Sequence, residues 1–421
     1  MVRQYAYDRL ADKQGVHTRL RDYFASVQMP EDETIHTEDD LAPVVELFHH
    51  TVRAGRYDNA YSMFRDRLSD SLYFRFGAYQ TCIGLLRGLF PDGEDCPPRL
   101  ASASDQAWTL NALANSYSLS GLPRYAASLF DMEEALQERI GPTKNLAIRL
   151  SNLADDQLEL GELRAAENSL RRSLRLCRDY DDKMWESATR QELARLRACL
   201  GDFRGAAAEL KVSTRYWQQT DGHQGLCVDE AYRALCELLA GRDESALYAA
   251  RHARELADEV AHVTFPYERD YIRAEWLLGW SLVSLASGNQ ITQDKCFSEA
   301  ETHLTEALTR CRRINLIELE PDILLTWARW HHARGDRNAA RSDAEDALSI
   351  ADRCEYRLCQ ADIHNFLARL DLEERNRDSA VRHAQTAYER AWCDGPPYCY
   401  KPSLDLAKRL LKELKAPIPN I

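Results

Sequence analysis

The protein has 421 residues, of which 45% are apolar and 29% are charged, and its formal net charge is −13. This acidic balance argues against a nucleic-acid partner, because phosphate binding needs a surplus of cations, and no apolar run is long enough to cross a membrane. Twelve cysteines are scattered along the chain without a CxxC pair or a signal peptide, which indicates reduced thiols and a cytoplasmic location.

Residues 1–38 form an N-terminal helical stub and acidic linker ahead of the repetitive part of the chain. Two stretches, Tyr5–Leu10 and Thr18–Val27, have the composition of short helices, and the segment Pro30–Thr34 after them is acidic and begins with a proline. Neither stretch shares the spacing found further along the chain. We therefore place the first domain boundary at residue 38.

From residue 39 onward, a glycine followed five residues later by an alanine recurs along the chain. The pairs are Gly55/Ala60, Gly121/Ala126, Gly161/Ala166, Gly201/Ala206, Gly241/Ala246 and Gly335/Ala340. In the centre of the chain, Gly161, Gly201 and Gly241 are each 40 residues apart. A small residue also recurs near the seventh position before the glycine, at Ala114, Ala154, Ala194, Ala234, Gly279, Ala328 and Ala368. Two small positions that share one period predict a repeat protein.

The stretches on both sides of each glycine are apolar at helical spacing, as in Leu110, Leu113 and Tyr117 before Gly121. Glycine can adopt the positive φ that ends the first helix, so each unit is predicted to be two antiparallel helices joined by a tight turn. One hairpin cannot bury both of its apolar faces. We therefore expect an all-α, right-handed solenoid of about eight antiparallel helix hairpins over residues 39–402.

The pattern formed by Leu110, Leu113, Ala114, Tyr117, Gly121, Ala126 and Phe130 resembles the tetratricopeptide repeat (TPR). The resemblance implies a superhelix whose first helices line a concave surface that binds extended peptides. The 40-residue period exceeds the family norm of about 34, and we expect the surplus to follow the second helix, as in Asp179–Met184. HEAT and armadillo arrays, with periods of about 40 to 47, are the alternative.

The repeat is interrupted twice, with insertions near 69–100 and 260–298. The first contains Phe90–Pro98, which has the composition of a loop, and the second divides between Val260–Tyr267 and Gly288–Asp294. Insertions in solenoids often bind partners, although a tolerated surface loop is the simpler interpretation. At the other end, residues 403–421 are predicted to form a capping helix, Ser403–Leu414, and a tail.

The segment Thr18–Phe24, followed by a linker and then repeats, resembles the junction below the winged-helix part of signal-transduction ATPases with numerous domains (STAND). In that family a nucleotide-binding switch carries a C-terminal TPR sensor. The resemblance implies that this chain is the sensor region of a larger bacterial signalling ATPase. Since the chain lacks a Walker A motif, the switch would lie outside it.

Motifs for catalysis or metal binding are missing from the sequence, including HExxH, GxSxG and the Rossmann glycines. The pairs His49-His50 and His331-His332 place adjacent side chains about 100° apart on a helix, so a pair cannot hold one ion from one face. Cysteines without nearby ligand partners are Cys354, Cys359, Cys393 and Cys399. We expect no cofactor, no metal and no enzymatic activity.

Basic clusters occur at Arg171, Arg172, Arg175 and Arg178 and at Arg310, Arg312 and Arg313. Both clusters fall on predicted second helices, which form the convex side. They are interpreted as solvated helix faces that pair with the abundant carboxylates, in preference to a nucleic-acid footprint.

The TPR frame predicts which side chains face the concave groove. These partner-binding candidates are Trp108, Asn111, Asn115, Asp155, Gln191, Arg195, Arg273, Trp276, Trp280, Arg329, His332, Asn365 and Arg369. Arg195, Arg329 and Arg369 share one frame position, and guanidinium groups suit carboxylate or phosphate recognition. Trp276 and Trp280, one helical turn apart, could form an aromatic wall. The alternative is that these arginines pair with Asp155, Asp322 or Asp362 and that the tryptophans belong to the core.

The sequence thus favours a non-enzymatic module that binds a protein or peptide, with an acidic peptide as the expected ligand because arginine recurs in the groove. Its expected context is ligand sensing within a STAND-type ATPase. Two alternatives stay open, namely a free-standing TPR scaffold or chaperone-like adaptor, and an enzyme with an unrecognised His/Cys site. The oligomeric state does not follow from the sequence pattern.

Overall fold

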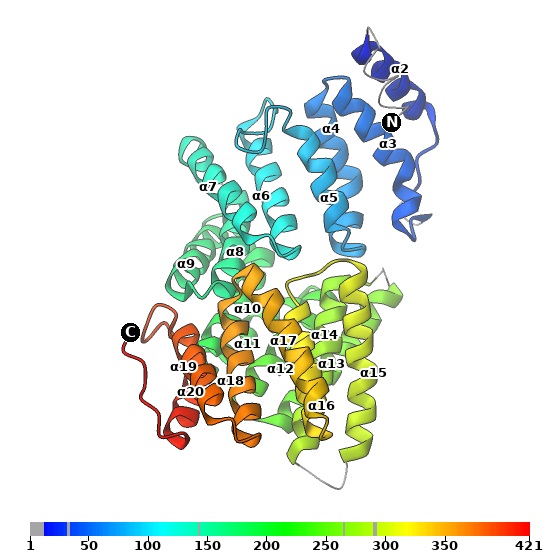
Figure 1. Ribbon diagram of the computed structural model, residues 1–421. Helices are drawn as coiled ribbons and strands as arrows, with labels where there is room; N and C mark the ends of the chain where they lie inside the picture. The colour runs from blue at the N-terminus through cyan, green and yellow to red at the C-terminus, as the bar shows by residue number, and fades with distance from the viewer. Residues whose placement is uncertain (1–11, 32–33, 142–143, 264–265, 289–292) are drawn as a thin grey trace. The chain divides into compact units, whose positions relative to one another are not determined.

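The computed structural model describes residues 12–31, 34–141, 144–263, 266–288 and 293–421 (Figure 1). These residues form helices and connecting turns without any strand, which confirms the predicted all-α solenoid of helical hairpins. The chain divides into two compact units, Met1–Gly141 and Pro142–Ile421, which are described separately. The predicted helix Tyr5–Leu10 lies outside the described residues.

The first unit contains short helices around the first hairpin and one regular hairpin. Its elements are α2 (Lys13–Ser26), η2 (Glu38–Leu41), α3 (Ala42–Arg53), α4 (Tyr57–Met63), η3 (Phe64–Leu68), η4 (Asp70–Arg75), α5 (Tyr79–Leu86), η5 (Arg87–Leu89), α6 (Ala103–Leu119) and α7 (Pro123–Ile140). The predicted stub helix is α2, which packs on α3. A hydrogen bond of 3.0 Å between the Nδ1 atoms of His17 and His50 joins these two helices.

The first predicted insertion is only partly a loop. Helix α4 continues without a break through the π-helical turns η3 and η4 to Arg75, so the extra residues first lengthen this helix. The short helix α5 follows, and the chain then runs without regular helix from Phe90 to Ser102. Arg99 stabilises this loop by donating two hydrogen bonds of 2.6 and 2.7 Å from Nη2 to the Asp92 carboxylate.

The second unit is a run of six hairpins with a terminal helix. Its helices are α8 (Lys144–Glu159), α9 (Leu163–Asp179), α10 (Lys183–Cys199), α11 (Phe203–Gln219), α12 (His223–Leu239), α13 (Asp243–Val263), α14 (Glu268–Gly288), α15 (Gln293–Arg313), α16 (Glu320–Ala333), α17 (Arg337–Cys354), α18 (Arg357–Glu373), α19 (Arg377–Trp392) and α20 (Lys401–Glu413). Even-numbered helices α8 to α18 are the first helices of their hairpins. Helix α20 is the predicted cap.

The 40-residue period comes from the length of the helices. Helices α9 to α12 each have 17 residues, and about three residues separate each helix from the next. The prediction that surplus residues follow the second helix at Asp179–Met184 is therefore wrong, because α9 ends at Asp179 and α10 begins at Lys183. Gly161, Gly201 and Gly241 adopt φ of +77°, +79° and +71° at the hairpin turns, as the spacing predicts.

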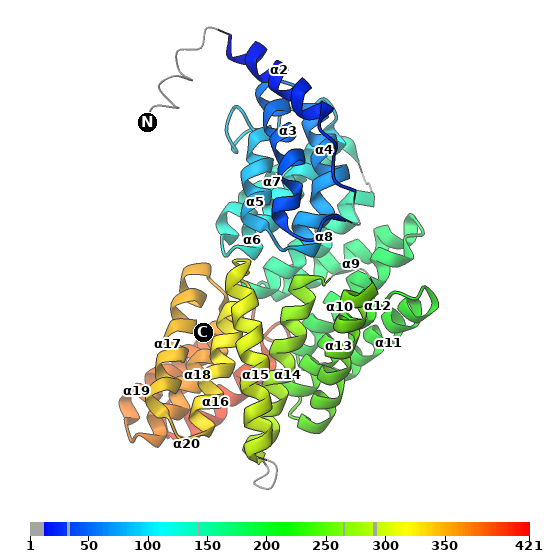
Figure 2. The same cartoon turned by 90° about the vertical axis from the view of Figure 1, so that its right-hand side faces the viewer.

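The second predicted insertion lengthens three helices. Helices α13, α14 and α15 each have 21 residues, so much of 260–298 is helical rather than loop. Figure 2 shows α14 and α15 side by side along this length. Their close packing also explains why the small residue of this repeat is Gly279, because a Cβ atom there would lie 2.6 Å from Cδ2 of Leu304.

The first helices of the second unit close into a ring. Each of α8, α10, α12, α14, α16 and α18 contacts the next, and α18 also contacts α8, while α20 packs on α18 (Figure 1). One apolar cluster joins the two ends of the ring and includes Leu158 and Leu163 from one end and Leu358 and Leu404 from the other. The predicted concave groove is consequently the inside of a closed ring.

Candidate functional site

The predicted groove residues fall in two units. Trp108, Asn111 and Asn115 lie on α6 of the first unit, where the Trp108 ring packs edge-on against Tyr61 at 5.6 Å between centroids. Asn115 donates a hydrogen bond of 3.0 Å to Oδ1 of Asn111. The other ten candidates belong to the second unit. Their binding role stays a prediction, and the structure divides them between the interior of the ring and one open pocket.

In the interior of the ring, Arg195 is paired with the protein's own carboxylates. It is 9% exposed, and its guanidinium donates to Asp155 and to Glu159 on α8. Arg269, at the start of α14, donates a further hydrogen bond of 2.8 Å to Asp155. For Arg195, the alternative that the sequence left open therefore holds, since this arginine forms an ion pair with Asp155.

The same charges control the protonation of this interior. Burial opposes ionisation of Asp155, but Arg195 and Arg269 outweigh it and hold the pKa of this carboxyl below its ordinary value. Burial raises the pKa of Glu159 to about 8 despite Arg195, and burial together with a nearby carboxylate raises the pKa of Asp322 to about 6. At neutral pH the Glu159 carboxyl therefore keeps its proton, whereas Asp155 is ionised.

Three further candidates in the interior contact a neighbouring first helix through a hydrogen bond or a cation–π stack. Gln191 donates to the carbonyl oxygen of Gly225 and to Oδ1 of Asp229, both at 2.9 Å. Arg273 pairs with Asp270 of its own helix at 3.1 Å and stacks over the Tyr232 ring on α12 at 5.2 Å from its centroid. Trp276 donates through its indole N–H to Oγ1 of Thr326 on α16 at 3.0 Å. These polar groups are used to join one first helix to the next.

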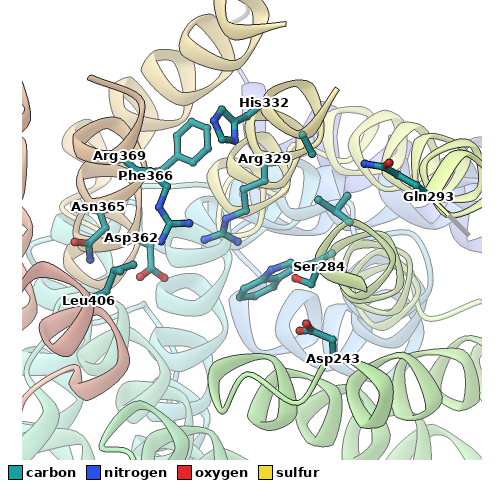
Figure 3. Close-up of a pocket in the computed structure, with 13 residues that line it drawn as sticks. Asp243, Ser284, Gln293, Arg329, His332, Asp362, Asn365, Phe366, Arg369 and Leu406 are labelled. Carbon is teal, nitrogen blue, oxygen red and sulfur yellow. The ribbon is translucent and has the colours of Figure 1, made fainter. Parts of the chain in front are cut away.

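The remaining candidates line a pocket of about 500 Å³ in the second unit (Figure 3). Trp280, Arg329, His332, Asn365 and Arg369 come from the later parts of α14, α16 and α18. The pocket also contains residues that the frame did not predict: Asp243, Val283, Ser284, Gln293, Ala333, Asp362, Phe366 and Leu406. Several of these come from second helices or from the cap, which the frame treats as outside the groove.

Two cations of this pocket differ from Arg195 in their pairing. Within the described residues, neither Arg329 nor Arg369 forms an ion pair with a carboxylate within 4.0 Å. Arg329 instead stacks over the Trp280 ring at 4.7 Å from its centroid, and Arg369 is exposed. Figure 3 shows the Arg329 and Arg369 side chains directed into the pocket. The charge of Arg329 also acts on Asp362, a carboxylate that lines the same pocket, although the two groups form no ion pair within 4.0 Å.

The pocket also has an apolar wall, which lies beside a buried amide. Asn365 is 1% exposed and donates through Nδ2 to the backbone oxygen of Ser403 at 3.0 Å, while its Oδ1 has no hydrogen-bond partner in the described part of the chain. Phe366 and Leu406 add apolar surface, and Trp276 stacks under Trp280 with ring centroids 5.7 Å apart. His332 pairs with Glu373 at 2.8 Å.

The histidine and cysteine candidates do not assemble into a metal centre. Across the described ranges, no three His, Cys, Asp or Glu side chains are grouped to hold an ion. His331 pairs with Asp343 at 2.7 Å, and the described cysteines are free thiols. The basic clusters are partly paired as well, for example Arg171 with Glu167 and Arg312 with Glu320. No described helix combines the length and apolarity that a membrane span requires.

Comparison with known proteins matches no family model and no curated protein. Among solved structures, a Rap protein complexed with Competence and Sporulation Factor is 11% identical, with a TM-score of 0.52 over 90% of this chain and 98% of that chain. The Rap conjugation gene regulator of the plasmid pLS20, in complex with the Phr peptide, is 11% identical with a TM-score of 0.49, over 89% and 96% of the two chains. A STAND protein with a TPR sensor from Pyrococcus horikoshii is 15% identical with a TM-score of 0.42, over 95% of this chain and 55% of that chain. At these identities the likeness shows the fold alone, a helical-hairpin solenoid of the tetratricopeptide type.

Proposed function

We propose that the protein is a non-enzymatic peptide-binding scaffold whose ligand site is the pocket lined by Trp280, Arg329, Asn365, Phe366 and Arg369. The expected ligand is a peptide segment that carries carboxylate groups. The observation that supports this most is the contrast in pairing. Among the described residues, Arg329 and Arg369 form no ion pair within 4.0 Å, whereas Arg195 at the same frame position pairs with two carboxylates.

The lining of the pocket fits the parts of such a ligand. Guanidinium groups bind carboxylates through paired, charge-assisted hydrogen bonds. Phe366 and Leu406 can contact an apolar side chain of the peptide. The similar fold of the Rap protein, which was solved in complex with Competence and Sporulation Factor, adds support at the level of the fold.

We propose further that the scaffold is cytoplasmic and serves as the sensor region of a larger signalling ATPase, on the basis of the Thr18–Phe24 segment and the 40-residue period. A free-standing scaffold or adaptor is the competing proposal. The coding sequence upstream of Met1 distinguishes them, because a Walker A motif in the same reading frame supports the ATPase and a separate gene for this chain contradicts it.

The binding proposal is tested by fluorescence anisotropy with two fluorescein-labelled hexapeptide pools. The acidic pool has Asp fixed at its last two positions and a free C-terminus, and the neutral pool has Ser at those positions and an amidated C-terminus. We expect the Arg329→Glu/Arg369→Glu double variant to lose at least about tenfold in affinity for the acidic pool, since each charge-assisted contact contributes about 1.5–3 kcal/mol. Circular dichroism should show unchanged helical content.

The matched control is Arg382→Glu, which reverses the charge of an exposed arginine on α19 outside the pocket. It should bind the acidic pool like the wild type. Equal binding by the double variant and the wild type contradicts the placement of the site. Equal binding of the two pools by the wild type contradicts the chemistry of the ligand.

A further inference from the structure

Arg269 makes a contact that no feature of the repeat frame indicates. It lies at the start of α14, and its guanidinium donates to Glu318 through Nε at 3.0 Å and through Nη2 at 2.6 Å. Nη2 also donates to Asp155 on α8 at 2.8 Å, across 114 residues of sequence. One side chain therefore joins the beginnings of α14 and α16 to α8 on another side of the ring.

The contact is placed to control the relative positions of α14 and α16. Arg269 precedes Trp280 on α14 by eleven residues, and Glu318 precedes Arg329 by the same number along the segment that leads into α16. Eleven residues of helix rise about 16 Å. The Arg269–Glu318 ion pair therefore joins the two segments about 16 Å before the Trp280–Arg329 stack joins them again. A helix moves as a rigid element over this length. A shift at Arg269 is therefore transmitted to the pocket.

Helices α14 and α16 are also joined by the hydrogen bond of 3.0 Å from the Trp276 indole N–H to Thr326, whereas the other ties of the ring lie elsewhere. At the seam, the hydroxyl of Tyr398 donates to Glu167 at 2.6 Å, and the backbone N–H of Arg164 donates to Asp394 at 2.9 Å. These contacts join α9 to the loop before α20 and do not involve α14 or α16. Arg269 consequently has a role that the seam cannot replace.

We propose that Arg269 is a positioning residue that sets the register of α14 against α16 and thereby shapes the Trp280–Arg329 wall of the ligand pocket. The inference rests on the proposed function, since it assigns to Arg269 control over the affinity of that same pocket. Arg269 acts through Glu318 and Asp155 and does not itself line the open pocket.

The test is a double-mutant cycle in affinity for the acidic hexapeptide pool. Arg269→Ala should lower affinity about tenfold in the wild-type background and have no effect when Arg329→Ala is already present, because a positioning residue matters only through the residue it positions. Arg269→Lys, which keeps the charge, should recover part of the loss. Additive losses in the cycle, or an unchanged affinity of Arg269→Ala, overturn the proposal.

A second measurement needs no ligand and so separates this inference from the proposed function. Hydrogen exchange of the free protein should speed up in Trp280–Ser284 and Arg329–Ala333 in the Arg269→Ala variant, because these segments lose one of the two contacts that join α14 to α16 ahead of them. The matched control is Arg251→Ala, which removes an exposed ion pair with Glu299 between α13 and α15. If the wild type binds neither pool but the exchange responds as expected, the proposed function fails and the positioning role stands. Unchanged exchange in Arg269→Ala overturns the positioning role whatever the pools show.

Discussion

Arg195 and Arg329 occupy the same position in two repeats, yet they lie in opposite chemical environments. Arg195 is in the interior of the ring with Asp155 and Glu159 as partners, and Arg329 lies on the Trp280 ring at an open pocket. The difference arises because Arg195 faces α8 directly, whereas the pocket widens between the later parts of α16 and α18. Equivalent positions in a repeat thus share a direction but not a partner.

The largest expected effect comes from breaking the interior. Arg195→Ala removes the guanidinium shared by the partly buried Asp155 and Glu159, and the expected cost is about 3 kcal/mol, at the low end for a broken buried ion pair, because Asp155 keeps Arg269. Urea denaturation should show a loss of this size in the free energy of unfolding. Arg369→Ala, which changes an exposed residue of the pocket, should alter the free energy of unfolding by no more than about 0.5 kcal/mol. Similar losses in the two variants would remove the distinction between interior and pocket.

An intermediate effect is expected from the pH dependence of the interior. Since the pKa of Glu159 is raised from 4.5 to about 8, the folded protein keeps a proton that the unfolded chain releases, and the free energy of unfolding falls as the pH rises between these values. In Glu159→Gln, the free energy of unfolding should fall less between pH 5 and pH 8 than it does in the wild type. The difference between the two falls should be about 1–3 kcal/mol.

The measurement is urea denaturation at several pH values, with Glu299→Gln on the outer surface as the control that should leave the slope unchanged. The same slope in Glu159→Gln and in the wild type would show that Glu159 does not hold the proton.

The smallest effect concerns the seam that closes the ring. Gly201→Ala and Gly241→Ala both place a side chain at positive φ, which costs about 1–2 kcal/mol. A Cβ at Gly201 would also lie 2.9 Å from Cγ of Lys401 on α20, whereas at Gly241 nothing lies within 4 Å. Thermal unfolding should therefore show Gly201→Ala to be the less stable variant by about 0.5 kcal/mol. If Gly241→Ala were the less stable variant, α20 would not be packed tightly against the turn of the α10–α11 hairpin.

Much of the local architecture was predictable from single residues. The positive φ of Gly161 and Gly201 and the small residue Ala154 depend on backbone geometry within one hairpin, and these signals lie within a few residues of one another. The distribution of the surplus residues was not predictable, because a 17-residue helix and a shorter helix with a longer loop differ little in composition.

The candidate site shows where sequence reasoning ended. Five of the residues predicted from the TPR frame, including Arg329 and Arg369, line one pocket. The frame also predicted Arg195 as a groove residue, and it gave no sign that Arg195 differs from these two arginines. It missed Phe366, which lies on α18 one residue after the predicted Asn365, and Leu406, since α20 belongs to no repeat and the frame assigns no groove position to a cap. No signal in the sequence pointed to Arg269, whose partner Asp155 is 114 residues away.

The sequence by itself determined that this protein is a chain of helical hairpins with arginine recurring on the first helices, because hairpin turns and helix crossings are set by neighbouring residues. Only the tertiary structure decided which of those arginines meets a carboxylate. The pairing of Arg269 with Asp155, 114 residues away, depends on the closure of the ring, where the small rotations of successive hairpins add up until α18 reaches α8. A sum of small rotations is a property of the whole second unit and of no single repeat.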